Sequence, residues 1–391
     1  MSTVATQRNV EVEVPVNIAL IKYWGKKDED HIIPVNNSVS LNIDELFART
    51  YVQCSYYDSM DSVSINNVTV DLTRNPRFLR CFDDYKASDM FAELCTFVQY
   101  ARQLIQGHAM LYDSAGIVSK PQLSFQVSST TNFPVGAGLA SSAAGFAAIA
   151  FGIGKMFDLT MNEVSSLARI GSGSACRSVF GGLVEWEAGS EPSGADSFAK
   201  QLTSDKSWPE LRAVVIVLDE SEKKVSSSEG MRRSMDTSEL LPYRAKEIVP
   251  NRIERLCEAF KAHDFEEFAR ITMADSNQFH AICLDTSPPL KYMSEASWQV
   301  VHAVEEFNSR GQIRAGYTFD AGPNACVFLQ NEDVVPFLLQ LSNYLTLPPT
   351  TMEDIENIAH VDIKEKANLC NAKNIVISGV GASPKVISNY D

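Results

Sequence analysis

The sequence lacks long hydrophobic runs. No stretch of eighteen or more apolar residues occurs among its 391 residues, so no segment is predicted to cross a membrane. The first ten residues contain no apolar signal core, and the stretch from Ser388 to Asp391 is not a known targeting address. These absences predict a cytoplasmic protein without a membrane partner.

Motifs for metal binding and disulfide bonding are missing as well. The eight cysteines include no C-x-x-C pair and no Cys/His cluster with zinc spacing, so a structural metal is not expected. Cys95 and Cys257 fall on the apolar faces of expected helices and are predicted to be reduced core thiols, which suits a cytosolic compartment. Neither a Gly-x-Ser-x-Gly elbow nor an HExxH helix occurs.

An excess of positive charge is also absent. The 49 Asp and Glu residues outnumber the 34 Lys and Arg residues, which gives a net charge of −15 at pH 7. This balance argues against a nucleic-acid or acidic-membrane partner. A polyanionic substrate would need a local group of cations, and Lys22, Lys26 and Lys27 form one such group in the sequence.

The length suits two domains, and the polar, turn-rich stretch 185–207 predicts a boundary that divides the chain into 1–200 and 201–391. The elements expected in the first domain are strands at 10–16, 38–43, 50–55 and 63–72 and helices at 90–105 and 160–170. In the second domain, strand-like runs at 211–218, 313–319, 325–329 and 375–380 alternate with helical patterns, which predicts a ferredoxin-like α+β sandwich. The stretch 223–231 is interpreted as a polar loop.

One glycine-rich loop, from Phe133 to Ala144, follows a predicted strand and leads into a helix of small residues. Glycines allow close backbone approach, and free N–H groups at a helix start favour a phosphate. The loop lacks the lysine of a Walker motif, and Ser141 stands where the dinucleotide fingerprint needs glycine. The local pattern predicts either a polyphosphate cradle or a plain loop before a tightly packed helix.

Three other charged positions allow two interpretations each. Lys22 to Lys26, at the end of an apolar strand, would hold an anion or form a solvated strand end. Arg177, within the glycine and serine loop 171–182, would be a surface helix residue or a fork for a carboxylate or phosphate. Asp320 is either a functional carboxylate at a strand end or a turn-forming residue before Gly-Pro.

Together these motifs resemble the GHMP kinase superfamily and, within it, the mevalonate diphosphate decarboxylase family. The superfamily's phosphate loop, Pro-x-x-x-Gly-Leu-x-Ser-Ser-Ala, matches Pro134 to Ala143. More specific strings match in the family's order and spacing at Asn17 with Lys22-Tyr23-Trp24-Gly25-Lys26, at Gly171 to Ser178, at Asp275-Ser276-Asn277-x-Phe279-His280-Ala281, and at Asp320 to Ala325. The resemblance extends from about residue 14 to residue 381.

The resemblance implies a two-domain GHMP kinase fold of the α+β class. Its N-terminal half is like the second domain of ribosomal protein S5, its C-terminal half is ferredoxin-like, and the active site lies in the cleft between them. Enzymes of this family use ATP and Mg²⁺ to phosphorylate the 3-hydroxyl of mevalonate 5-diphosphate and then release phosphate and CO₂. The product, isopentenyl diphosphate, is a precursor of isoprenoids and sterols. A homodimer is implied by the family alone.

The resemblance also implies roles for individual residues. Asp320 is expected to be the base near the 3-hydroxyl, and Arg177, with Asn17 beside it, the ligand of the substrate carboxylate. Further substrate contacts are expected from Lys22, Tyr23, Arg74, Ser172, Ser174 and Ser227. The ATP phosphates are expected on Gly136, Gly138, Leu139, Ala140, Ser141 and Ser142, with Ser141 as a Mg²⁺ contact. The chain departs from some bacterial members at Ser228, where those members place an arginine on the diphosphate.

Two rival functions stay open from the sequence. One is a kinase of the same superfamily that phosphorylates mevalonate, phosphomevalonate or a sugar without decarboxylation. The other is a catalytically silent sensor that binds ATP and a metabolite. Asp320, Arg177 and the loop serines are all present, which favours an active decarboxylase.

Overall fold

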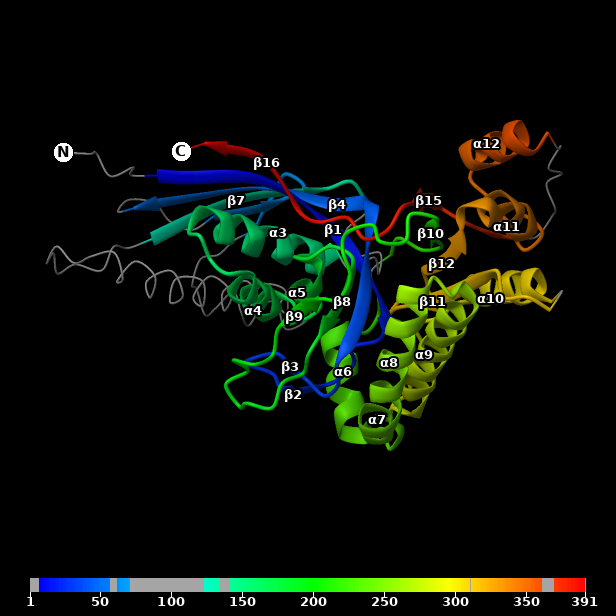
Figure 1. Cartoon of the computed structure of the whole chain (residues 1–391), viewed down its shortest axis with the longest axis horizontal. Coiled ribbons are helices and arrows are strands. Elements are labelled where there is room, and N and C mark those ends of the chain that lie inside the picture. The colour runs from blue at the N-terminus through cyan, green and yellow to red at the C-terminus, as the bar shows by residue number, and fades with distance from the viewer. Residues whose placement is uncertain are drawn as a thin grey trace, which may run out of the picture.

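The computed structural model describes residues 7–56, 62–70, 123–133, 141–221, 223–309, 311–360 and 369–390. Two main sheets organise the molecule (Figure 1). The first, of eight strands, lies on the side of the chain ends, and the second, of four strands, lies beside the long helices of the other side. The functional residues come from the region where these two parts meet.

The first sheet is built on two long antiparallel strands, β1 (Gln7–Ile21) and β4 (Ser38–Tyr56). Alternate residues of β1, among them Val10, Val12 and Val14, are fully buried, as a strand with one apolar face requires. The other strands of this sheet are β5 (Ser62–Ile65), β6 (Val68–Val70), β7 (Leu123–Thr131), β8 (Leu183–Trp186), β9 (Ala199–Gln201) and β16 (Lys385–Tyr390). A separate pair, β2 (Lys26–Asp28) and β3 (Ile33–Pro34), follows β1.

Helix α3 (Ser141–Met156) packs closely against this sheet, with Gly152 facing β4. A Cβ added at Gly152 would lie 3.0 Å from Val52 Cγ2 of β4. Helices α4 (Met161–Gly171) and α5 (Ala175–Ser178) pack beside it. The expected buried helix after the glycine loop is therefore confirmed.

The second sheet has the strand order β11-β12-β10-β15, and all its pairs are antiparallel. Its strands are β10 (Leu211–Val217), β11 (Ala315–Phe319), β12 (Ala325–Gln330) and β15 (Asn374–Ser378). With helices between the first and second strands and between the third and fourth, this order is the ferredoxin-like one. The ferredoxin-like prediction is confirmed.

The helices of this part are α6 (Ser227–Thr237), α7 (Leu240–Tyr243), a π-helical turn (Arg244–Ile248), α8 (Val249–Ala262), α9 (Phe265–Asp285), α10 (Glu295–Asn308), α11 (Val334–Leu341) and α12 (Pro349–Ala359). A 3₁₀ turn (Asn331–Asp333) and a short parallel pair, β13 (Leu345–Thr346) with β14 (Cys370–Asn371), complete it. Among these, α9 is the element that contacts both β11 and β1.

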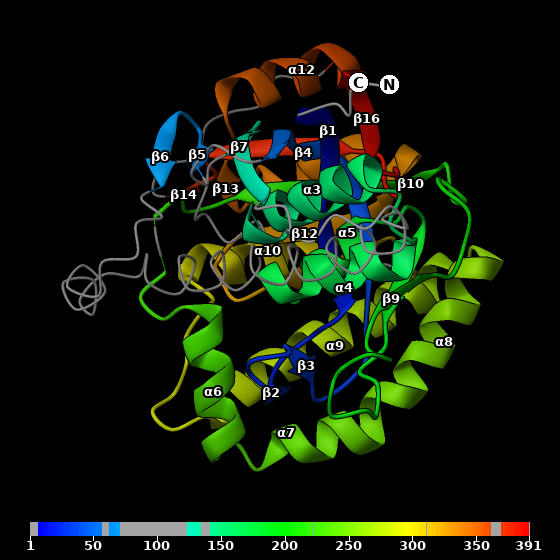
Figure 2. The same cartoon turned by 90° about the vertical axis from the view of Figure 1, so that its left-hand side faces the viewer.

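The chain passes between the two parts of the molecule twice, once between β9 and β10 and once between β15 and β16. Strand β16 returns to the first sheet and pairs with β1, so Asn9 faces Tyr390. Figures 1 and 2 show β16 beside β1. At its other end β1, paired with β4 as far as Ile21, approaches α9, and the Lys22 N–H donates to Asp275 of α9, which places Lys22 at the junction.

Several local predictions are corrected by the structure. The strands expected at 38–43 and 50–55 are one continuous strand, β4. The strand expected at 63–72 is a hairpin of β5 and β6, because Asn66 and Asn67 adopt positive φ angles of 48° and 64° and turn the chain. Of the polar loop expected at 223–231, residues 223–226 lie outside any helix, whereas α6 begins at Ser227, with Ser226 as its N-cap.

Other predictions have mixed outcomes. The capping box at Thr160 is present, with Glu163 as its second member. The helix expected at 90–105, with Cys95, lies outside the described residues. The cysteines that the structure describes, Cys54, Cys176, Cys257, Cys283, Cys326 and Cys370, are free thiols. Among the described helices, none has the length and apolar character needed to span a membrane.

Candidate active site

Lys22 and Asp320 form an ion pair at the junction of the two sheets. Lys22 directly follows β1, and Asp320 directly follows β11. Lys22 Nζ lies 2.5 Å from Asp320 Oδ1. The lysine side chain is 2% exposed and the aspartate side chain is 30% exposed, so the carboxylate faces an accessible space while its cation is covered. Asp320 is thus more than a turn-forming residue.

A small cavity lies against this carboxylate. Ile18 of β1, Val215 of β10 and Thr318 of β11 line it together with Lys22 and Asp320. Its walls come from strands of both sheets, which places it between the two parts of the molecule. A carboxylate at the edge of such a cavity can accept a proton from a bound hydroxyl group.

Arg177 is buried beside β1 and β4, with 2% of its surface exposed. Its Nε donates to Ser40 Oγ at 2.9 Å, its Nη1 to Ser38 Oγ at 2.5 Å and its Nη2 to Asn17 Oδ1 at 3.2 Å. Of the two interpretations of this residue, the surface helix position is therefore wrong. The guanidinium is held in a fixed orientation inside the molecule.

The partners of Arg177 are all neutral, and within the described ranges the guanidinium makes no ion pair. Burial lowers the pKa of Arg177, whereas the neighbouring Cys176 and Asp320 act in the opposite direction. The guanidinium stays protonated, as arginine side chains do in proteins. A buried cation without a carboxylate partner favours an anionic ligand, so this site can bind a carboxylate or a phosphate.

Asn17 fixes the loop that carries Arg177. Its Nδ2 donates to Ser178 Oγ at 2.8 Å and to the Ser174 carbonyl at 3.0 Å, while its Oδ1 accepts from Arg177. One carboxamide therefore links the start and the end of α5 to the guanidinium. Asn17 and Arg177, which were predicted to be neighbours, are together in the structure, and the carbonyl of Ser174, a predicted substrate contact, lies beside them.

Tyr23 packs between the end of β1 and the second glycine loop. Its ring centroid is 4.7 Å from that of Trp186, at an interplanar angle of 62°. A Cβ added at Gly173 would lie 3.0 Å from both aromatic rings, which explains the glycine at this position. Since Lys22 and Trp24 are each 2% exposed, the solvated-strand-end interpretation of this stretch is wrong.

The predicted group of three lysines is divided by its acidic partners. Lys22 is paired with Asp320, and Lys26 Nζ lies 2.6 Å from Glu29 Oε2. Lys27 is exposed. The three lysines therefore do not form one binding site for a polyanionic ligand, and such a ligand must be bound by other groups.

The two glycine loops meet at a pair of serines. Ser142 Oγ, in the first turn of α3, lies 3.4 Å from Ser172 Oγ, at the end of α4. The first turn of α3 begins at Ser141 and contains no acidic residue, which suits the binding of phosphate at a helix N-terminus. The loop residues Gly136, Gly138, Leu139 and Ala140 lie outside the described residues.

Of two further predicted substrate contacts, Ser227 and Arg74, the structure describes only Ser227. Ser227 begins α6, and its hydroxyl accepts a hydrogen bond of 3.0 Å from Lys223 Nζ. Helix α6 reaches the site through Trp24, whose Nε1 donates to Ser234 Oγ at 2.9 Å. Arg74 lies outside the described residues.

Sequence reasoning missed several residues of this site. Ser38 and Ser40, the partners of Arg177, were interpreted only as part of a strand. Their signal was the alternation of small polar residues with Val39 and Leu41, which places the hydroxyls on one buried face. Asp275 belongs to a string that the sequence singled out, but its contact with Lys22 spans 253 residues and could not be predicted from a local pattern.

His280 of α9 also lies near the ion pair. Burial and, to a smaller extent, the charge of Lys22 lower its pKa, Asp320 and a hydrogen bond with the Phe319 backbone act in the opposite direction, and the net result is a pKa of about 4. The imidazole is therefore neutral near pH 7. Its closeness to Lys22 and Asp320 makes it part of the surroundings of the candidate site.

Comparison with known proteins identifies the family. A family model described as the diphosphomevalonate decarboxylase-like N-terminal domain matches residues 14–199, and one described as the mevalonate 5-diphosphate decarboxylase C-terminal domain matches residues 213–387. The diphosphomevalonate decarboxylase of Danio rerio is 37% identical, with 97% of this chain and 93% of the relative covered. That of Homo sapiens is 39% identical, with 84% of this chain and 78% of the relative covered.

Solved structures give the same result. The mevalonate diphosphate decarboxylase of Trypanosoma brucei superimposes with a TM-score of 0.79 at 31% identity, covering 97% of this chain and 98% of the other. A protein designated MDDEF, solved with MVAPP, AMPPCP and magnesium, superimposes with a TM-score of 0.75 at 27% identity, covering 98% and 99%. The fold, the site and these relatives agree, and the chain belongs to the diphosphomevalonate decarboxylase family.

Proposed function

We propose that this chain catalyses the ATP-dependent decarboxylation of mevalonate 5-diphosphate to isopentenyl diphosphate, with release of ADP, phosphate and CO₂. The observation that carries the proposal is the buried Arg177 guanidinium with neutral partners only. A decarboxylase must hold the substrate carboxylate in a fixed orientation relative to the departing phosphate. A kinase, which leaves the carboxylate in place, has no such requirement.

Asp320 acts as the base in this proposal. As the oxygen of the 3-hydroxyl bonds to the γ-phosphorus of ATP, its proton passes to the Asp320 carboxylate and ADP leaves. A carboxylate is too weak a base to remove the proton of a tertiary alcohol beforehand, so the transfer accompanies O–P bond formation. The ammonium of Lys22, 2.5 Å away, balances the charge of Asp320 before the transfer.

In the second step the C–C bond to the carboxylate breaks. Its electron pair forms the double bond of the product, while the C–O bond to phosphate breaks and phosphate leaves. Arg177 orients the carboxylate, with Asn17, Ser172 and Ser174 around it. Tight binding of the ground-state carboxylate would oppose loss of CO₂, so we propose that Arg177 contributes through orientation.

The phosphates of ATP are proposed to bind at the first glycine loop and the start of α3, that is, at Gly136, Gly138, Leu139, Ala140, Ser141 and Ser142. Mg²⁺ neutralises charge on the transferred phosphoryl group when it is bound. Ser141 is the proposed contact of that ion. The absence of an acidic residue from the first turn of α3 supports phosphate binding there.

The contact between Lys22 and Asp320 changes the expected role of the lysine. Its ammonium contacts the base, so we propose that Lys22 balances the charge of Asp320. The substrate diphosphate is then proposed to bind mainly to Tyr23, Ser227 and Arg74.

We also propose a cytoplasmic homodimer. The proposed division into 1–200 and 201–391 falls inside β9.

A coupled assay with mevalonate 5-diphosphate and MgATP tests the function. Equal amounts of ADP, phosphate and CO₂ are expected. ADP with a stable phosphorylated product would show a kinase instead, and the absence of all three products would show a binding protein. Mevalonate and phosphomevalonate serve as control substrates that lack the diphosphate.

A further inference from the structure

Two consecutive residues of α9 hold the backbone on both sides of the ion pair. The Asp275 carboxylate accepts a hydrogen bond of 2.8 Å from the Lys22 N–H. The Ser276 hydroxyl accepts one of 3.0 Å from the N–H of Phe319, the residue before Asp320. Asp275 and Ser276 are both 0% exposed. They open the string beginning at Asp275 that the sequence singled out and that the proposed chemistry does not use.

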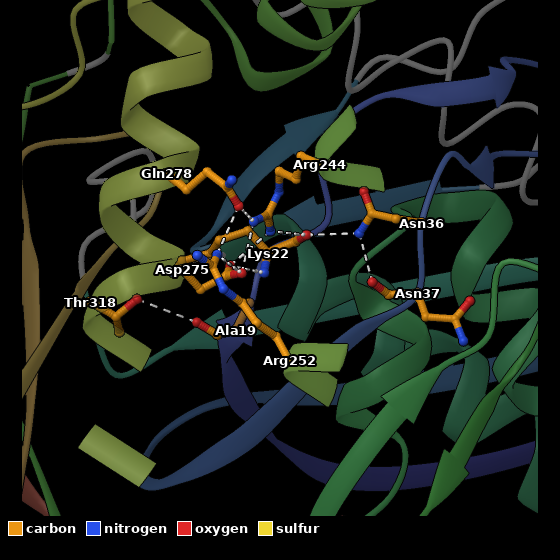
Figure 3. Close-up of polar contacts among 9 residues, drawn as sticks. All are labelled: Ala19, Lys22, Asn36, Asn37, Arg244, Arg252, Asp275, Gln278 and Thr318. Atoms are coloured by element: carbon orange, nitrogen blue, oxygen red, sulfur yellow. Dashed lines mark hydrogen bonds and ion pairs between the residues drawn. The ribbon is translucent and has the colours of Figure 1, made fainter. Parts of the chain in front are cut away.

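Arg244 closes a ring of contacts around the Lys22 peptide groups, as Figure 3 shows. Its Nη1 and Nη2 donate to the two Asp275 oxygens at 2.8 Å each, and Nη2 also donates to the Lys22 carbonyl at 3.3 Å. Asn36 Nδ2 donates to the same carbonyl at 3.1 Å. Both the N–H and the C=O of Lys22 are thus fixed, and among the residues that the structure describes the acceptor of the N–H is Asp275.

Fold stability alone gives little reason for this pair. Arg244 and Asp275 are both 0% exposed, and a fully buried ion pair contributes little more to stability than apolar residues of the same volume. A bidentate arginine–carboxylate pair does fix geometry well. The pair comes from the π-helical turn and from α9, whereas the residue it holds, Lys22, directly follows β1.

Arg252 offers a built-in comparison. It contacts the same carboxylate, with Nη1 donating to Asp275 Oδ2 at 3.0 Å, and donates to Gln278 Oε1 at 2.8 Å. Neither of these hydrogen bonds involves Lys22, and Arg244 Nη1 donates to the same Gln278 oxygen at 2.9 Å. The two arginines therefore share Asp275, but only Arg244 bonds to the lysine backbone.

We propose that Arg244, Asp275 and Ser276 are positioning residues that set Lys22 against Asp320 for the reaction proposed above. The pair of α9 residues fixes the backbone of Lys22 and the residue before Asp320, and Arg244 fixes the Lys22 carbonyl. With its backbone fixed in this way, Lys22 needs to sample few conformations to bring its ammonium to Asp320 Oδ1. Displacements of about 1 Å in such an arrangement reduce turnover about 100-fold.

The first test compares Arg244→Gln with Arg252→Gln in the full-length protein. For Arg244→Gln we expect kcat to fall about 100-fold while the KM for ATP stays within about twofold. Arg252→Gln keeps the ring around Lys22 and is expected to stay within about threefold of the parent kcat. Equal losses in the two variants would overturn the proposal, because they would show a shared effect on folding.

A double-mutant cycle with Lys22→Met separates positioning from general disruption. If Arg244 acts through Lys22, Arg244→Gln lowers the single-turnover rate of CO₂ release by less than about threefold when Lys22 is already methionine. The same fold loss in both backgrounds would contradict the proposal. If Arg244→Gln does not fold, Arg244→Lys keeps a cation beside Asp275 but cannot form the bidentate contact, and it takes the same place in the cycle.

The inference rests on the proposed function, yet the two fail in different ways. A parent protein that releases no CO₂ would contradict the proposed function. An active parent whose Arg244 variants keep full kcat would contradict only the positioning role. Near-UV circular dichroism on each variant confirms that the compared proteins are folded.

Discussion

The Asn17 carboxamide lies against the Arg177 guanidinium, with Asn17 Oδ1 3.2 Å from Arg177 Nη2. Its other end, Nδ2, is bonded to Ser178 and to the Ser174 carbonyl. Asparagine is the right size to link these groups without adding charge. The arrangement keeps Arg177 oriented and leaves its positive charge available to a ligand.

Replacing this amide by a carboxylate is therefore expected to block the site. In Asn17→Asp, the new carboxylate would pair with Arg177 and compete with the carboxylate of the substrate. We expect the KM for mevalonate 5-diphosphate to rise about 100-fold, or about 2.7 kcal/mol, while the KM for ATP changes little. Steady-state kinetics with each substrate varied in turn measures both values. Unchanged kinetics would contradict the role given to Arg177.

Removal of the positive charge of Arg177 is a second test of the role of this residue. Arg177→Gln is expected to lower the rate of CO₂ release by about 10³-fold or more, since orientation of the reacting carboxylate is lost. The matched control is Arg169→Gln. Arg169 is equally buried, at 2% exposure, and donates to the Gly194 carbonyl in a structural contact. Similar losses of activity in the two variants would indicate a folding effect.

The Asp320 carboxylate is expected to be needed as a proton acceptor. Asp320→Asn keeps the shape and loses the acceptor, so we predict a fall in turnover of about 10³-fold with ATP affinity nearly unchanged. Rapid-quench measurement of ADP formation and equilibrium binding of an ATP analogue check the two parts. Retention of parental turnover would show that another group takes the proton.

The local parts of this structure could be predicted because their causes are local. The ferredoxin-like sheet follows from strand and helix periodicity, and the α4 start follows from the reciprocal contacts of Thr160 and Glu163. The turn between β5 and β6 was missed, although two successive asparagines with positive φ, Asn66 and Asn67, are its cause. Asparagine tolerates this conformation better than most residues.

The arrangement of the site could be predicted only in part. The resemblance brought Asn17 together with Arg177 before any geometry was known, and the structure confirms that contact. The position of the Lys22 ammonium on Asp320 joins residues 298 positions apart. Such a contact depends on how β1 and β11 meet, and no spacing within either strand encodes it.

His280 provides a prediction about pH. Burial and the Lys22 charge lower its folded pKa from 6.5 to about 4. Between these values the unfolded chain binds a proton and the folded chain does not, so the free energy of unfolding falls as the pH falls. From pH 7.5 to pH 5.0 the expected loss from this residue is about 2 kcal/mol. The contribution is fully present above pH 6.5.

Two measurements check this titration. In NMR spectra recorded against pH, the chain's six histidines give separate ring signals, and the signal missing from His280→Gln identifies the residue. We expect that signal to titrate near pH 4.

The urea midpoint should fall more between pH 7.5 and pH 5.0 in the parent than in His280→Gln, since glutamine binds no proton in this range. His302→Gln, at an exposed histidine of α10, is the control and should keep the parental pH dependence. A His280 signal that titrates near 6.5, with equal midpoint shifts in all three proteins, would show that neither burial nor Lys22 perturbs this imidazole.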